Sequence, residues 1–283
     1  MYLKQIKGLY KVNFTEHPVV ELKGPEHKEW LYTISSQAFA KDRPNICSNA
    51  FLKADGGLIA AFMQASFNDK TYLFLNPYNK DQALEHLDFC HFGEDLEFTL
   101  LEGGYQRWFV DAQEHLVENH MEEGFIVFSY PGLKGCEVFT LKDLDLDLPE
   151  KNFADLRFRF FQQGVPISGL DISVDNMILE GPFDDYVTDE KGCYPGQETI
   201  AKVYTYGRKA KSFYRAQIEK IPENTAITCN EAKCGDLVSY FDYNQKHWAW
   251  LRISNAFVKK WQQGEPLVLG EENLKLIDMT KHQ

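Results

Sequence analysis

The spacing of apolar residues in the first part of the chain predicts antiparallel strands interrupted by single helices. Trp30 and Ile34 recur at helical spacing, which predicts a helix over residues 26–40. Apolar runs on either side of Asp55-Gly56 predict a β-hairpin. A further helix is predicted from Asp81, and further strands over residues 71–75, 97–102, 106–110, 125–130 and 136–141. This order of elements is typical of an α+β fold and not of a doubly wound sheet.

The pattern changes after about residue 209, where only short strands separated by turn residues are predicted. In the strand over residues 247–253, Trp248 and Trp250 lie on one face, and we expect both rings to pack in a core. The remaining strands are predicted over residues 213–218, 226–229, 237–241 and 267–269. Short strands at such spacing close most simply into a small β-barrel. We therefore divide the chain into residues 1–208 and a barrel domain over residues 209–283.

Composition restricts the class of protein. A chain of 283 residues buries about three quarters of its unfolded surface, which allows a substantial core. The longest apolar stretch, residues 58–63, is too short to span a bilayer. The basic N-terminus lacks the apolar segment of a signal peptide. We expect a protein that has no membrane partner and resides in the cytoplasm, or in an organelle matrix if a presequence was removed.

The cysteines and histidines give little support for a metal site. The six cysteines are scattered and form no Cys-x-x-Cys pair, which disfavours a disulfide framework and a zinc ribbon. His86, Cys90 and His91 have ligand-like spacing, but Cys90 also falls on the apolar stripe of its predicted helix. We expect Cys90 to be a core residue and assign no metal ligand.

The formal charge of −12 disfavours binding to nucleic acid, except at a local basic surface. One stretch, residues 202–215, carries basic and aromatic residues and no acidic residue. It is compatible with an anionic ligand, with a phosphate backbone, or with a solvated strand edge. Its basic residues are Lys202, Arg208, Lys209, Lys211 and Arg215.

The densest chemistry lies in residues 191–198, Lys-Gly-Cys-Tyr-Pro-Gly-Gln-Glu. The Pro-Gly pair interrupts regular structure, and Ile200 and Val203 then form the apolar face of a short helix from Gln197. A helix N-terminus and a nearby amine both stabilise a thiolate, so Cys193 is predicted to be reactive, with Lys191 as its activator. The alternative is an inert, buried cysteine.

These eight residues resemble the signature of the YgfZ family, folate-binding relatives of the glycine-cleavage T-protein. Pro195 fills the one variable position. Gly164-Val165-Pro166, followed by Gly169 and Asp171, is similar to a second segment of that family, and the resemblance covers about residues 45–215. It implies a T-protein-like domain of antiparallel sheets and helices, followed by the small barrel.

The resemblance also implies a cofactor, partners and site residues. The cofactor is tetrahydrofolate or a one-carbon derivative, and the partners are iron–sulfur proteins or their assembly factors. The implied role extends to tRNA modification, with a contact to tRNA that is indirect or weak. Cys193 and Lys191 take the catalytic positions. The residues implied in folate binding are Gly192, Tyr194, Gly196, Gln197, Glu198, Lys202 and Arg208, with Lys209 as a further candidate for the folate tail.

One difference from the aminomethyltransferases distinguishes folate binding from aminomethyl transfer. The aminomethyltransferases carry paired aspartates where this chain has Ala60 and Ala61. Alanine can neither accept a proton nor stabilise a developing cation, so aminomethyl transfer is disfavoured. Two alternatives stay open: a folate-dependent aminomethyltransferase or demethylase that uses Asp55 or Glu198, and a non-catalytic adaptor for iron–sulfur proteins.

Overall fold

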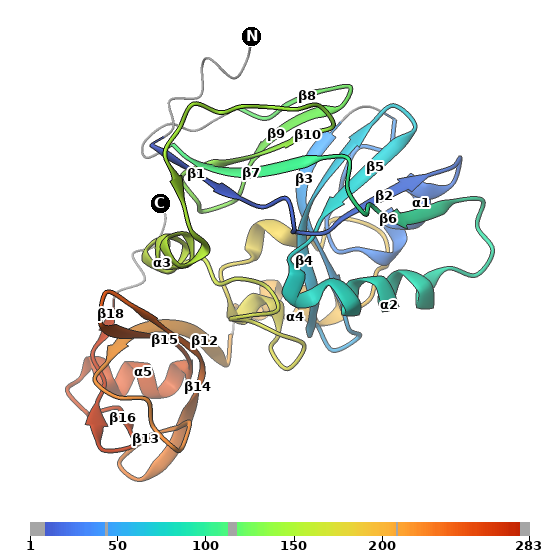
Figure 1. Cartoon of the computed structure of the whole chain (residues 1–283). Helices are drawn as coiled ribbons and strands as arrows, with labels where there is room; N and C mark the ends of the chain where they lie inside the picture. Colours follow the sequence, from blue (N-terminus) through green and yellow to red (C-terminus); the bar gives the residue numbers. More distant parts are fainter. Residues whose placement is uncertain (1–8, 43–44, 113–117, 208, 278–283) are drawn as a thin grey trace.

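Three sheets and five α-helices make up the part of the chain that the computed structural model describes, residues 9–42, 45–112, 118–207 and 209–277 (Figure 1). Nearly all strand pairs are antiparallel, and the exception pairs two short segments, β1 and β11. The predicted α+β class is therefore confirmed.

The first sheet has five strands in the order β3-β4-β5-β2-β6. Its strands β3 and β4 form the predicted hairpin around Asp55-Gly56. One face packs against α1 (His27–Ile34) and α2 (Lys80–Cys90) through a core that includes Trp30, Phe62 and Leu87. The strands are β2 (Val19–Lys23), β3 (Asn45–Leu52), β4 (Leu58–Phe67), β5 (Lys70–Phe74) and β6 (Glu97–Leu100).

Helix α1 is shorter than predicted, because two serines redirect the chain. Ser35 donates its hydroxyl to the carbonyl of Leu31 (2.6 Å) and ends the helix. Ser36 then bonds through its backbone N–H to the carbonyl of Ala50 (2.9 Å) and through its hydroxyl to that of Tyr186 (2.8 Å). These bonds hold residues 35–40 against β3, outside the helix.

The second sheet has six strands in the order β11-β1-β7-β10-β9-β8. It packs on the other face of the first sheet through a shared core that includes Phe74, Phe128 and Phe139. The predicted strands on either side of Gly103-Gly104 exist, but β6 belongs to the first sheet and β7 to the second. The strands are β1 (Tyr10–Asn13), β7 (Gln106–Asp111), β8 (His120–Glu122), β9 (Phe125–Ser129), β10 (Cys136–Thr140) and β11 (Glu150–Lys151).

The third sheet has seven strands in the order β17-β16-β13-β14-β15-β12-β18 and curls around α5 (Asn255–Gln262). All five strands predicted after residue 209 are present. Within the described residues β17 and β18 are the two edges, so the sheet is a half-barrel and not the closed barrel that we expected. The strands are β12 (Lys211–Ile218), β13 (Ala226–Cys229), β14 (Ala232–Tyr243), β15 (Lys246–Ser254), β16 (Val268–Leu269), β17 (Glu272–Asn273) and β18 (Leu276–Ile277).

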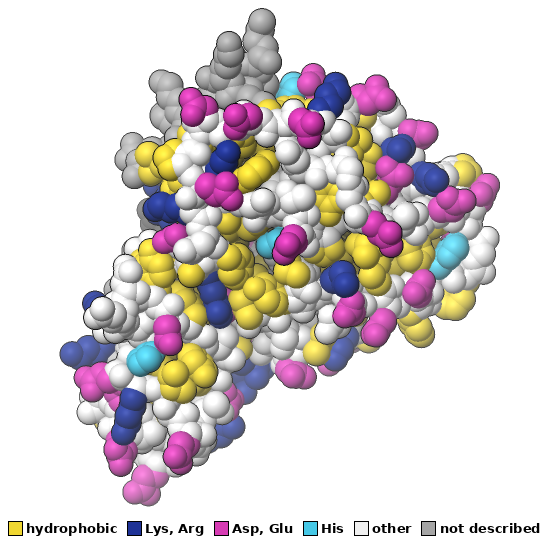
Figure 2. All heavy atoms as spheres, in the orientation of Figure 1, with side chains coloured by type: hydrophobic (Ala, Val, Ile, Leu, Met, Phe, Trp, Pro, Cys, Tyr) yellow, Lys and Arg dark blue, Asp and Glu magenta, His cyan; other side chains and the backbone are white. Residues whose placement is uncertain are grey.

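Helix α3 (Phe153–Gln163), which the sequence analysis did not predict, joins the half-barrel to the two other sheets. Its Phe161 ring lies 5.3 Å from the Trp250 ring and 5.5 Å from the Trp248 ring, measured between centroids. The prediction that both tryptophans pack in a core is confirmed, although that core lies between the half-barrel and the rest of the chain. On the face drawn in Figure 2, apolar side chains gather along this junction, while acidic side chains are spread over both parts.

Candidate functional site

The signature segment packs against the tip of the β3–β4 hairpin. Helix α4 (Gln197–Tyr206) begins at the predicted residue, with Ile200 buried and Val203 packed against the same core. Gly196 has a φ of 86°, and a Cβ at this position would lie 2.7 Å from the backbone oxygen of Lys53. The glycine is therefore required both by the backbone conformation and by the close approach of the hairpin.

We expect Gly196→Ala to lower the free energy of unfolding by about 2–4 kcal/mol, because it combines a left-handed conformation with a backbone clash. Gly192→Ala is the matched control, since no atom lies within 4 Å of a Cβ at that position. Urea denaturation of the two variants checks this. Equal stability of the two variants would contradict the packing described here.

The amine of Lys191 lies at the end of α1, and its predicted role as activator of Cys193 stays a prediction. This amine is buried, donates hydrogen bonds to the carbonyls of Tyr32 and Ser35, and lies 4.3 Å from the centre of the Tyr32 ring. Burial lowers the pKa of Lys191 to about 8, and the thiol that interacts with its charge is that of Cys47. Lys191 therefore anchors the signature segment to α1.

The other signature residues divide into two groups. Gln197 donates to the carbonyl of Lys191 (2.8 Å) and Tyr194 donates to that of Thr188, so both hold the loop in shape. Gly192, Cys193 and Glu198 are exposed.

Three of the basic residues in the 202–215 stretch already have partners within the described residues. Lys202 pairs with Glu198 (2.7 Å) and Lys209 with Asp184 (3.2 Å). Arg215 is buried and donates to the backbone oxygens of Phe161 and Gln162. Arg208 lies outside the described residues. The folate-tail role of these side chains stays a prediction, and any anion that binds here competes with carboxylates already present.

A cavity of about 30 Å³ lies where α3, β4 and the residue 165–168 segment meet. Its walls are mostly aromatic and apolar, and Ala61 is among them. Ser168 accepts from the backbone N–H of Ala61 (3.0 Å) and from the amide of Asn79 (2.7 Å). No signature residue lines this cavity. Its polar lining residues are His17, Asn76, Tyr130, Ser168 and Tyr186.

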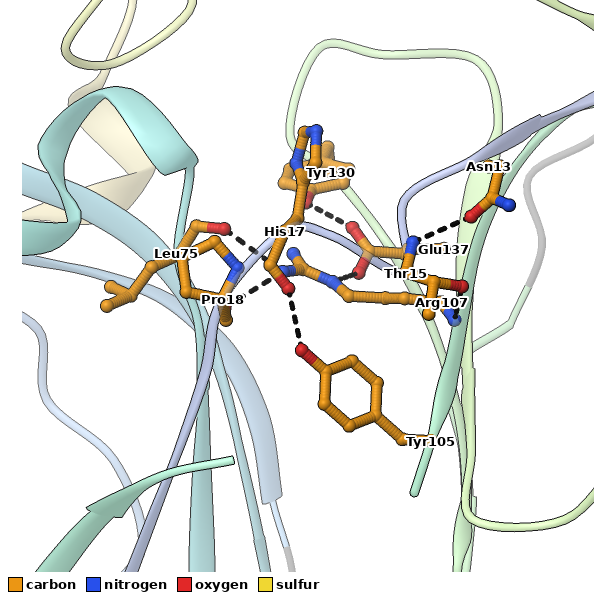
Figure 3. Close-up of polar contacts among 9 residues, drawn as sticks. All are labelled: Asn13, Thr15, His17, Pro18, Leu75, Tyr105, Arg107, Tyr130 and Glu137. Carbon is orange, nitrogen blue, oxygen red and sulfur yellow. Dashed lines mark hydrogen bonds and ion pairs between the residues drawn. The ribbon is translucent and has the colours of Figure 1, made fainter. Parts of the chain in front are cut away.

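Figure 3 shows a polar network that includes two residues lining the cavity, His17 and Tyr130. Arg107 and Glu137 form an ion pair that is almost fully buried, and the hydroxyl of Tyr130 donates to the second oxygen of Glu137 (2.5 Å). Arg107 also donates to the backbone oxygens of Pro18 and Leu75, both at 3.0 Å. The network fixes Tyr130 and joins the two sheets at the cavity.

His17 contributes an unused polar atom to this cavity. Its ring stacks on Phe14 at 4.0 Å, and its buried Nδ1 has no hydrogen-bond partner among the described residues. Burial, together with the Arg107 charge, lowers the pKa of His17 to about 3, so the imidazole is neutral at physiological pH. His17 and Tyr130 were not predicted as site residues. The one sequence signal for this site is the presence of Arg107 and Glu137 within otherwise apolar strands.

The chain resembles a solved structure along almost its whole length. The crystal structure of glycine cleavage system aminomethyltransferase T from Bartonella henselae superposes with a TM-score of 0.71, covering 97% of this chain and 86% of that one at 14% sequence identity. The chain has the fold of a glycine-cleavage aminomethyltransferase.

The match in sequence is more limited than the match in fold. A chloroplastic protein of Arabidopsis thaliana, described as a transferase, is 29% identical over 120 residues, which is 42% of this chain and 27% of that protein. The match thus spans about a quarter of the relative's length. No protein-family model matches the chain.

Within this T-protein fold, the two alternative carboxylates lie away from the cavity. The Asp55 side chain is exposed and accepts from the backbone N–H of Gly57 (2.9 Å) in the hairpin turn. Glu198 is exposed in its pair with Lys202. Neither carboxylate lines the cavity that Ala61 lines.

The described residues contain no group of three His, Cys, Asp or Glu side chains placed to hold a metal ion. His86 lies 3.7 Å from the Cys90 sulfur and packs on the ring of Phe51. Cys90 is half-buried against the α1–α2 core, as predicted. Among the helices of the described chain, none is long and apolar enough to cross a membrane.

Proposed function

We propose that this protein binds a reduced folate in the cavity lined by Ala61 and that it does not itself transfer an aminomethyl group. The observation that carries the proposal is the position of Ala61 on the cavity wall. The resemblance to aminomethyltransferases places a carboxylate there, and a methyl group supplies no proton acceptor. In this proposal the protein binds the folate expected for a T-protein fold but lacks the carboxylate needed for aminomethyl transfer.

The cavity has the chemistry that suits a pterin. Ligand sites for flat heteroaromatic groups combine apolar walls with a few polar atoms that fix orientation. Here Phe160 and Phe183 are apolar walls, while the neutral His17 ring is a polar group whose Nδ1 has no hydrogen-bond partner among the described residues. A cavity of about 30 Å³ holds one or two water molecules, so folate binding requires wall side chains to move apart.

In this proposal partner proteins bind at the signature segment, residues 191–198. Cys193 is exposed and supplies a thiol, while Lys191, Tyr194, Gly196 and Gln197 hold its loop. We propose that tetrahydrofolate and this thiol together support the maintenance of iron–sulfur enzymes, and through them tRNA modification.

We expect Cys193→Ser to abolish this support without weakening folate binding. In a strain that lacks the gene, a Cys193→Ser copy should leave iron–sulfur enzyme activity at the level of the empty strain. Cys47→Ser is the matched control, because Cys47 is half-buried and lies outside the signature. Full restoration by Cys193→Ser would contradict the assigned role of the thiol.

The aminomethyltransferase alternative is tested on the purified protein. With tetrahydrofolate and an aminomethyl donor, we expect no methylene-tetrahydrofolate above the uncatalysed level. Steady turnover would contradict the proposal and would favour a carboxylate such as Asp55 or Glu198. The adaptor alternative predicts the same Cys193→Ser phenotype but no binding of folate.

A further inference from the structure

Two phenylalanines at the end of α2 are the most exposed large apolar side chains among the described residues. Phe89 is 75% exposed and Phe92 is 82% exposed. Their ring centroids lie 6.4 Å apart with the planes nearly perpendicular, so the two rings form one continuous surface. We call this surface the Phe89–Phe92 patch.

The backbone beneath the patch is firmly held. The buried Trp30 indole donates to the carbonyl of Cys90 (2.9 Å), and the backbone N–H of Phe92 donates to the carboxylate of Glu94 (2.9 Å). Between them, the His91 ring packs edge-on against Trp30 and Phe98, each at 6.0 Å. The two phenylalanines are therefore presented to solvent by an ordered turn.

The patch lies in a strongly acidic part of the chain. Residues 81–97 contain six carboxylates and no lysine or arginine. Two of the six are paired, Asp81 with Lys80 and Glu97 with Lys23. The others form no salt bridge within the described residues: Glu85, Asp88, Glu94 and Asp95. Along α2 in Figure 2, acidic side chains accordingly lie beside apolar ones.

We propose that the Phe89–Phe92 patch docks a segment of another protein in which apolar residues are flanked by lysine or arginine. Two rigid aromatic rings are typical anchors of an interface, and the unpaired carboxylates select basic residues beside the apolar ones. The same charges disfavour the two other occupants. A second copy would bring two acidic surfaces together, and an anionic membrane surface would repel this one.

The test is a selection of random-sequence displayed peptides on the immobilised full-length protein. We expect the enriched peptides to combine apolar residues with an excess of lysine and arginine. They should bind the F89S/F92S variant at least about tenfold more weakly, as expected when interface anchors are removed. The E85Q/D88N variant should also bind these peptides more weakly. Tyr240→Ser is the control: it alters an exposed ring of the half-barrel and should bind the peptides as the unchanged protein does.

Four results would overturn the proposal. The first is enriched peptides with no excess of basic residues, and the second is enriched peptides that bind F89S/F92S as tightly as the unchanged protein. The third is a dimer in sedimentation that F89S/F92S abolishes, which assigns the patch to a second copy. The fourth is Phe-dependent binding to phosphatidylserine vesicles. None of these depends on folate binding, so the proposal stands or falls separately from the function proposed above.

Discussion

Replacing Glu137 by glutamine is expected to lower the free energy of unfolding by about 3–5 kcal/mol, because it leaves the Arg107 charge unpaired in the protein interior. The two side chains are 0% and 1% exposed, so water cannot solvate the remaining cation. The glutamine has the same shape, which separates the loss of charge from a loss of packing. Urea denaturation, followed by tryptophan fluorescence, measures the change.

Tyr130→Phe is the matched control for this variant. It removes one hydrogen bond to Glu137 and leaves the ion pair intact, so we expect a loss of only about 1 kcal/mol. If Glu137→Gln were no more destabilising than Tyr130→Phe, Arg107 would not depend on Glu137 for its neutralisation.

Phe161→Ala is expected to lower the free energy of unfolding by about 3–5 kcal/mol, the usual cost of deleting a buried aromatic ring. The ring is 2% exposed and lies 5.4 Å from Phe241 and 5.3 Å from Trp250 between centroids. Because these partners belong to the half-barrel, the cavity left behind should also loosen its attachment. Limited proteolysis should then cut near residue 209 faster than in the unchanged protein.

Phe89→Ala controls for the loss of a phenylalanine as such. Its side chain is exposed, so we expect a change within about 0.5 kcal/mol. If both variants lost the same stability, or if proteolysis near residue 209 were unchanged in Phe161→Ala, the half-barrel would be held by other contacts. The packing around Phe161 would then not join the two parts.

Local patterns predicted those helices and strands whose sequence signals lie within a few neighbouring positions. The Asp55-Gly56 hairpin, the start of α4 and the strands of the half-barrel follow from turn residues and alternation within a few positions. Helix α3 was missed although Asn152 and Asp155 form a capping box at its start. Its apolar residues face several partners, so Phe158 packs on Tyr243 while Phe160 packs on Phe109, and no single stripe emerges.

The direction in which a side chain points, and contacts between residues far apart in the sequence, were not predictable from local patterns. Lys191 lies two residues from Cys193 in sequence, but the carbonyls at the end of α1 bind its amine. The cavity brings together His17, Ala61, Tyr130 and Ser168, which belong to four separate segments. Only the packing of the two sheets and α3 places them side by side, so no spacing in the sequence predicted this site.

The central claim is that the cavity beside Ala61 binds a reduced folate, and calorimetric titration with tetrahydrofolate tests it most directly. We expect saturable binding to the unchanged protein and to Cys193→Ser. Ala61→Leu fills the cavity and should abolish binding, and a circular dichroism spectrum checks that this variant folds, since overpacking costs about 1–3 kcal/mol. Absence of binding to the folded, unchanged protein at millimolar tetrahydrofolate, or undiminished binding to folded Ala61→Leu, would contradict the account.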